Sequence, residues 1–163
     1  GQGTNSYTPT QLSRYVTTIA NSGTCYDLSL IKKIENVDGE ITYQNKHKGH
    51  GTVDIDATLW NTVHNGMRRV VQNHTDKTAL INQINVEVAG KTGTAEENLV
   101  RPSHALFVSY APFAEPEISV TTVIPYGYSS GNAEELAGLI YAYYFDPEKL
   151  KDASITGNVN VSD

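Results

Sequence analysis

The sequence of 163 residues lacks long apolar runs and contains a single cysteine. No stretch of about 18 apolar residues is present, and residues 1–9 show neither the basic start nor the apolar centre of a signal peptide. We therefore expect that this chain neither spans a membrane nor directs its own export. Because Cys25 has no second cysteine, the sequence excludes an internal disulfide, a cysteine-based metal cluster and a dithiol redox pair.

Basic residues are also few in this chain. Lysine and arginine number 12 against 18 acidic residues, which gives a formal net charge of -6. No run of lysine or arginine could follow a phosphate backbone, so nucleic acid is not expected as a partner. The length suits one domain, and the 39% hydrophobic content can build a modest core. We assign residues 1–146 to this domain and residues 147–163 to a polar C-terminal tail.

The first half of the chain has the local signals of a helix, a hairpin and a second helix. Thr8 and Gln11 form a capping box with proline at the first helical position, and the segment around Asn21-Ser22-Gly23 should end this helix. Asp38-Gly39 between two β-prone runs is typical of a hairpin turn, and Asp56 can cap the second helix. The expected bounds are 9–20 and 56–73 for the helices, and 28–36 and 41–43 for the hairpin strands.

The second half reads as three strands and a final helix. Residues 84–89 alternate apolar and polar side chains and lead into the glycine-rich segment 90–94, which predicts a strand with one buried face. Asn132 and Glu135 resemble a second capping box, so we expect the last helix to begin at Asn132. The other expected strands are 104–110 and 118–124. This order predicts an α+β fold in which helices cover one small antiparallel sheet.

The candidate functional residues are Lys91-Thr92-Gly93-Thr94, at the end of the first of these strands. Alternation along a strand places the two threonines on one face, so both hydroxyls can meet one carboxylate. Lys91 faces the other way and must bring its positive charge from the side, through its flexible stem. Gly93 has no side chain, which allows an acyl group to lie close to the backbone. This combination favours binding of a ligand that ends in a carboxylate.

The context of this string indicates a family. It occurs together with Gly1-Gln2-Gly3, with Thr8-Pro9 and Gln11 ahead of an amphipathic helix, and with the later segment 104–112. The combination resembles class B penicillin-binding proteins, which are membrane-anchored D,D-transpeptidases of peptidoglycan synthesis, and the similarity runs from Gly1 to about Tyr144.

The resemblance implies a partial β-lactamase/transpeptidase-like fold and a position at the extracytoplasmic face of the membrane, through an anchor upstream of this chain. Its ligands would be the peptidoglycan stem peptide that ends in D-Ala-D-Ala, and β-lactams. No cofactor and no metal are implied.

The resemblance also implies a role for each residue of the string. Lys91 would lie against the catalytic hydroxyls and add positive potential. Thr92, Gly93 and Thr94 would bind the substrate. The backbone N–H of Thr94 would be one half of an oxyanion hole, and the other half would be the N–H of the nucleophile itself.

The nucleophile that this family uses is not evident in the chain. Ser29 and Lys32 match the letters of Ser-x-x-Lys, but they lie in a β-prone run where their side chains would point to opposite faces. Ser130-Gly131-Asn132 matches Ser-x-Asn, but it follows the Lys-Thr-Gly strand, and its asparagine is better explained as a helix cap. We therefore expect the catalytic serine in an upstream part of the same domain, which would be a partner of this chain. The chain alone should be inactive.

A sheet that lacks its upstream neighbours would expose an edge and an apolar face, so self-association is a further expectation.

Other readings of single residues are weaker. A phosphate-binding loop would need glycine in place of Asn85 and a helix directly after Thr92. His47 and His50 have the spacing of metal ligands, but a third ligand is lacking, and Asn73-His74-Thr75 fits a glycosylation acceptor only by chance. We expect His64 and His104 to be packing or capping residues and not general bases. Tyr141, Tyr143 and Tyr144 are expected to form a core and surface face of a helix and not a binding platform.

Two other functions remain open for the parent protein. One is a β-lactam sensor or a β-lactamase, and the other is a non-catalytic scaffold that binds the cell wall. An upstream sequence with Ser-x-x-Lys followed by Ser-x-Asn would favour the transpeptidase over the scaffold. Rapid turnover of penicillin would favour the β-lactamase.

Overall fold

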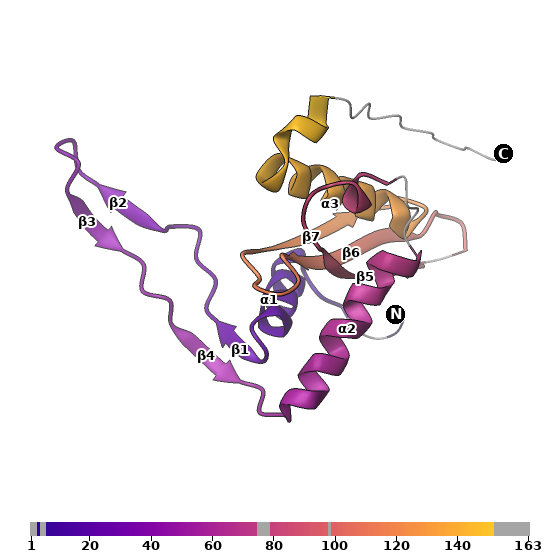
Figure 1. Ribbon diagram of the computed structural model, residues 1–163, viewed down its shortest axis with the longest axis horizontal. Coiled ribbons are helices and arrows are strands. Elements are labelled where there is room, and N and C mark those ends of the chain that lie inside the picture. Colours follow the sequence, from indigo (N-terminus) through magenta and orange to yellow (C-terminus); the bar gives the residue numbers. More distant parts are fainter. Residues whose placement is uncertain (1–2, 4–5, 75–78, 98, 152–163) are drawn as a thin grey trace.

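The computed structural model describes residues 3, 6–74, 79–97 and 99–151. A three-stranded antiparallel sheet forms the centre, helices pack on both of its faces, and a two-stranded arm projects from the body (Figure 1). The elements are α1 (Pro9–Ala20), β1 (Thr24–Tyr26), β2 (Lys33–Glu35), β3 (Ile41–Gln44), β4 (Gly49–Thr52), α2 (Ala57–His74), η1 (Leu80–Asn82), β5 (Ala89–Ala95), β6 (His104–Ala111), β7 (Ile118–Ile124), α3 (Ser130–Phe145) and η2 (Pro147–Lys151). The predicted α+β class is confirmed. Gly1 and Gln2 of the predicted lead-in lie outside the described residues.

Both ends of α1 are fixed by local hydrogen bonds. The Thr8 hydroxyl accepts from the Gln11 N–H at 3.2 Å, and the Thr8 N–H donates to the Gln11 side chain at 2.8 Å, so the predicted capping box is present. At the other end, the Gly23 N–H donates to the Thr18 carbonyl at 2.8 Å and the Ser22 N–H to the Ile19 carbonyl at 2.9 Å. These two bonds form a Schellman motif. The predicted bounds of this helix are confirmed.

The predicted hairpin exists but is shorter in its first strand. β2 and β3 pair antiparallel, and Gly39 adopts a φ of +83° in the turn between them. The prediction of a strand over 28–36 was wrong for residues 28–32. There the Ser29 hydroxyl accepts from the Ile31 N–H at 3.2 Å, and this local bond replaces strand pairing. A second pair, β1 with β4, closes the base of the arm and was not predicted, because its short strands lack alternating hydrophobicity.

The second helix begins where the sequence indicated. Asp56 Oδ1 accepts hydrogen bonds from the hydroxyl and the N–H of Thr58, at 2.5 and 2.7 Å. These bonds stabilise the carboxylate and hold the pKa of Asp56 below its ordinary value. α2 then continues to His74, so the expected end near residue 73 is confirmed. Thr75 of the chance glycosylation motif lies outside the described residues.

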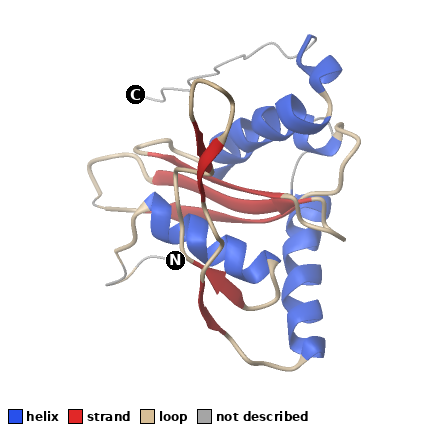
Figure 2. Ribbon diagram, turned by 90° about the vertical axis from the view of Figure 1, so that its left-hand side faces the viewer, coloured by secondary structure: helices blue, strands red, loops and turns tan. Residues whose placement is uncertain are grey.

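The central sheet has the order β5-β6-β7, with antiparallel pairing throughout (Figure 1). Helices lie on both sides of this sheet (Figure 2). The predicted strands 104–110 and 118–124 are confirmed, but the prediction of a strand over 84–88 was wrong. These residues follow η1 without strand pairing, although Ile84 and Val88 are buried and Asn85 and Glu87 are exposed. The alternation in the sequence therefore reported burial correctly, while the strand itself begins at Ala89, where pairing with β6 begins.

Two apolar cores lie on the opposite faces of the sheet. α3 packs on one core, which includes Phe107 and Tyr141, and α1 packs on the other, which includes Val16 and Tyr110. Helix α2 contributes to both, through Val71 and Met67. The buried Tyr141 hydroxyl donates to Ser109 Oγ at 2.9 Å, and burial raises the pKa of Tyr141 above the ordinary phenol value. The predicted division of the tyrosine cluster into core and surface is confirmed, since Tyr143 and Tyr144 are exposed.

The start of α3 differs from the prediction. The helix begins at Ser130, and its N-cap is Ser129, whose hydroxyl accepts from the Gly131 N–H at 3.3 Å. Asn132 lies inside the first turn instead of capping the helix, and its side-chain amide donates to the Gly127 carbonyl at 2.8 Å. The cap therefore sits three residues earlier than predicted, because the Ser129 hydroxyl makes the capping bond while the Asn132 amide is engaged with Gly127.

The chain beyond α3 continues into η2, where the partly buried Leu150 packs against the core formed with α3. Residues 152–163 of the predicted tail lie outside the described residues. The boundary at 146 and 147 remains a prediction.

Candidate active site

The predicted site residues lie on β5, an edge strand of the central sheet. Three hydrogen bonds show which backbone groups face the open side. The Glu87 carbonyl accepts from the Phe113 N–H at 2.8 Å, on the side of β6. The Val88 carbonyl accepts from Arg68 at 3.1 Å, and the Thr92 carbonyl accepts from the Lys91 ammonium group at 2.9 Å. Even-numbered residues therefore direct their backbone groups away from β6. The same alternation places the N–H of Thr94 on the open edge.

Side-chain directions on β5 follow the unbroken register with β6. Thr92 stands opposite Phe107 and Thr94 opposite Ala105, on the face that α3 covers. Lys91 stands opposite Val108, on the face of α1 and α2. The prediction that the threonines share one face and Lys91 the other is confirmed.

The strand changes from buried to exposed along its length. Ala89 and Gly90 are buried, Thr92 and Gly93 are half-buried, and Lys91 and Thr94 are exposed. Helix α2 packs on β5, and its Arg68 bonds the Val88 carbonyl, directly before the strand begins. The stretch Lys91–Thr94 is therefore reachable from the open side of the sheet.

The two glycines of β5, Gly90 and Gly93, differ in whether the fold has room for a side chain. A Cβ on Gly90 would lie 2.3 Å from Cζ of the buried Phe107, so packing within the chain excludes a side chain there. A Cβ on Gly93 would lie 3.4 Å from Leu106 Cβ, which is an ordinary contact. The fold thus requires glycine at 90 but not at 93.

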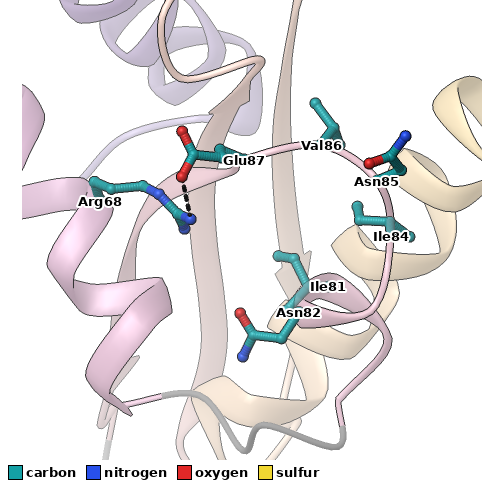
Figure 3. Close-up of a pocket in the computed structure, with 7 residues that line it drawn as sticks. All are labelled: Arg68, Ile81, Asn82, Ile84, Asn85, Val86 and Glu87. Atoms are coloured by element: carbon teal, nitrogen blue, oxygen red, sulfur yellow. Dashed lines mark hydrogen bonds and ion pairs between the residues drawn. The ribbon is translucent and has the colours of Figure 1, made fainter.

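A pocket of about 270 Å³ lies beside the start of β5 (Figure 3). Arg68 and Glu87 face each other at its rim, with Arg68 Nη2 at 2.9 Å from Glu87 Oε1. The remaining lining residues are Ile81, Asn82, Ile84, Asn85 and Val86. Arg68 also bonds the Val88 carbonyl, so it ties α2 to the chain just before the site. No local sequence pattern indicates this contact, because Arg68 and its partners are 19 and 20 positions apart.

We expect Arg68→Met to lower the free energy of unfolding by about 1–2 kcal/mol, because the Val88 carbonyl loses a charge-assisted hydrogen bond. Arg69→Met is the matched control, since Arg69 is exposed on the same helix and should change stability by less than about 0.5 kcal/mol. Urea unfolding followed by circular dichroism measures both values. Equal stabilities of the two variants would contradict the role of Arg68.

The serines that resemble catalytic motifs lie elsewhere. Ser29 lies in an exposed loop of the arm, where its hydroxyl donates to the Ile31 carbonyl and accepts from the Ile31 N–H. Ser130 is the first residue of α3. The geometry required of Ser-x-x-Lys, with serine and lysine on one helical face, is not present at Ser29 and Lys32, because neither residue is helical.

The histidines have structural contacts. His64 Nε2 lies 2.8 Å from the Ile19 carbonyl, and His50 Nδ1 lies 2.9 Å from Asp27. His47 packs edge-on against Tyr26. Within the described ranges, no group of three or more histidine, cysteine, aspartate or glutamate side chains could hold a metal ion.

The sheet with helices on both faces, and an edge strand that carries Lys-Thr-Gly-Thr, places the chain in the β-lactamase and transpeptidase class of folds. The chain belongs to the penicillin-binding protein transpeptidase domain family, whose family model matches residues 1–142. The resemblance inferred from the motifs is thereby confirmed.

Relatives of known name agree with this family. The chain is 29% identical to the peptidoglycan D,D-transpeptidase MrdA of Haemophilus influenzae over 90% of this chain and 25% of that protein. It is 32% identical to penicillin-binding protein 2B of Streptococcus pneumoniae over 75% of this chain and 20% of that protein. The chain thus spans about a quarter of the length of these relatives.

Solved structures show the same fold. Penicillin-binding protein 2B from S. pneumoniae strain R6 superposes with a TM-score of 0.70 at 28% identity, over 86% of this chain and 25% of that one. Penicillin-binding protein A of Mycobacterium tuberculosis, as an imipenem acyl-enzyme complex, superposes with a TM-score of 0.76 at 22% identity, over 88% and 32% of the two chains. The latter identity supports the fold alone.

Proposed function

We propose that this chain is the substrate-binding C-terminal part of a peptidoglycan D,D-transpeptidase whose catalytic serine lies upstream. The observation that carries the proposal is the open edge of β5, where Lys91–Thr94 combine exposure, a bare backbone at Gly93 and an outward N–H at Thr94. Names of relatives over most of the chain support the reaction class.

The reaction proceeds in two acyl transfers. The serine oxygen attacks the carbonyl of the penultimate D-alanine, loses its proton to a base, and expels the terminal D-alanine as the protonated amine. An acceptor amine then attacks the acyl-serine ester and gives up a proton to the base, and the serine oxygen receives a proton as it leaves. A β-lactam undergoes the first step, because its amide bond occupies the place of the D-Ala-D-Ala bond.

Each residue of the edge has a role in this reaction. The hydroxyls of Thr92 and Thr94 bind the terminal carboxylate, and the Lys91 ammonium group adds positive potential beside the serine. The Thr94 N–H donates to the oxyanion of the tetrahedral intermediate. Removal of one such donor typically lowers kcat by about 10²–10³, or about 2.7–4 kcal/mol of transition-state stabilisation. Gly93 leaves room for the acyl group against the strand.

The proposal includes the surroundings of the chain. The upstream part of the transpeptidase domain packs on this fragment and supplies the serine, and an upstream anchor holds the protein at the extracytoplasmic face of the membrane. The exposed apolar side chains of Leu59, Val63 and Tyr15 fit a surface that upstream residues cover, and in the isolated chain they favour self-association. Among the described residues, no helix combines the length and the apolar composition needed to cross a membrane.

We expect fluorescent penicillin to label the parent protein and not the isolated chain. Peptide mass spectrometry of the labelled parent should place the adduct on a serine upstream of Gly1. A stable adduct on Ser29 or Ser130 of the isolated chain would refute the upstream location. Rapid release of hydrolysed penicillin would indicate a β-lactamase, and a parent without any adduct would indicate a scaffold.

A further inference from the structure

The turn between β7 and α3 contains two tyrosines with left-handed backbone. Tyr126 has a φ of +54° and Tyr128 a φ of +63°, values that residues with a side chain seldom adopt. Such conformations cost free energy and persist only where surrounding contacts hold them, and they are concentrated at functional sites. The contacts of this turn therefore indicate what it holds in place.

The turn packs against the start of β6. The Tyr126 N–H donates to His104 Nδ1 at 3.1 Å, and the Tyr128 N–H donates to the Ser103 carbonyl at 3.0 Å. A Cβ on Gly127 would lie 2.9 Å from Ala105 Cβ, so the backbone of the turn touches β6 directly. These contacts fix the turn to the end of the β5–β6 connection.

The Tyr126 side chain also reaches the beginning of that connection. Its hydroxyl accepts from Arg101 Nη1 at 2.7 Å and donates to Glu97 Oε2 at 3.1 Å. The Arg101 guanidinium lies 5.3 Å from the centre of the Tyr126 ring, and His104 Nε2 lies 3.7 Å from Glu97 Oε2. One tyrosine thus joins the two ends of the β5–β6 connection. We call Glu97, Arg101, His104 and Tyr126 the Tyr126 cluster.

The Tyr126 cluster adjoins the proposed substrate edge. His104 pairs with Ala95, the residue after Thr94, and Glu97 follows two residues later. A carboxylate this close to a site for an anionic ligand repels that ligand unless it is held and neutralised. Within the cluster, the Glu97 carboxylate accepts from Tyr126 and lies near His104, while Arg101 supplies a positive charge to the same hydroxyl.

We propose that Tyr126 is a positioning residue for the substrate edge. It holds the Glu97 carboxylate away from the ligand's carboxylate and fixes the end of β5 that carries the Thr94 N–H. This inference rests on the proposed function, since the ligand is the anionic peptide or β-lactam that binds along Lys91–Thr94.

The test compares Tyr126→Phe and Tyr128→Phe in the whole parent protein. Each variant loses one hydroxyl from the same turn, but only the Tyr126 hydroxyl belongs to the cluster. For acylation by penicillin, we expect Tyr126→Phe to lower the ratio of acylation rate constant to Kd by about three- to tenfold, mostly through a weaker Kd, because a held charge is released. Tyr128→Phe should match the wild type.

A second substitution separates charge from structure. Glu97→Gln added to Tyr126→Phe removes the released carboxylate and should return Kd to within about twofold of the wild type. A purely structural role of Tyr126 would leave the double variant as weak as the single one, and this result would overturn the inference. So would equal Kd values for Tyr126→Phe and Tyr128→Phe.

Amide hydrogen exchange of residues 94–104 in the same variants gives a readout that does not depend on catalysis. We expect faster exchange in Tyr126→Phe only, and unchanged exchange would overturn the inference even if the parent formed no acyl adduct. A wild-type parent that forms no adduct would refute the proposed function instead. The two failures are therefore distinguishable.

Discussion

Gly93→Ala is expected to leave the fold intact and to slow acylation of the parent protein by penicillin about a hundredfold. The new Cβ meets Leu106 at an ordinary distance of 3.4 Å, so the chain accommodates it. The methyl group lies on the face of β5 that carries Lys91, and we expect it to occupy the space in which the acyl group lies against the strand. A displacement of about 1 Å in a reacting group costs about 10²-fold in rate. Stopped-flow labelling with fluorescent penicillin measures the effect.

Gly131→Ala is the matched control for this variant. Gly131 is exposed in the first turn of α3, and its Cβ would lie 3.6 Å from the nearest atom, Ser129 Oγ. The free energy of unfolding of both alanine variants should be no more than about 0.5 kcal/mol below that of the wild type, and it can exceed it, because alanine restricts the unfolded chain more than glycine does. If Gly93→Ala were acylated as fast as Gly131→Ala, the ligand would not lie along this part of β5.

Gly90→Ala, in contrast to Gly93→Ala, is expected to lower the free energy of unfolding of the protein. Its Cβ would lie 2.3 Å from Phe107 Cζ and 3.1 Å from Ser109 Cβ, and Phe107 is fully buried in the core formed with α3. Overpacking of this kind costs about 1–3 kcal/mol. Thermal and urea unfolding should both show the loss.

Two further variants make this prediction specific. Gly66→Ala on α2 is the control, because no atom lies within 4 Å of the Cβ position at Gly66. This substitution should raise the free energy of unfolding by about 0.5–1 kcal/mol, since alanine has the higher helix propensity. Phe107→Leu in the Gly90→Ala background removes the ring atoms that clash. In a double-mutant cycle the pair should therefore cost less than the sum of the single changes. Strict additivity would contradict the clash as the cause.

Local signals in the sequence predicted the elements whose causes are local. The Thr8–Gln11 capping box, the Gly39 turn and the Asp56 cap each depend on residues within a few positions, and all three are present. The alternation over 84–88 was misread as a strand, because whether an extended segment becomes a strand depends on a partner distant in the sequence. The β1–β4 pair was missed because its short strands carry no alternating hydrophobicity.

The candidate site divides in the same way. The assignment of Lys91–Thr94 as site residues came from the motif itself. The alternation of their side chains could be predicted because strand geometry determines it. The open edge could not, since it depends on the order β5-β6-β7. Contacts of Arg68 and Tyr126 join segments that are 19 to 29 positions apart, and no local pattern encodes them.

A crystal structure of the parent protein acylated by penicillin tests the central proposal most directly. We expect the acyl carbonyl oxygen within hydrogen-bond distance of the Thr94 N–H, and the penicillin carboxylate at the hydroxyls of Thr92 and Thr94. An acyl group whose oxygen and carboxylate both bind away from β5 would contradict the assignment of this strand as the substrate edge.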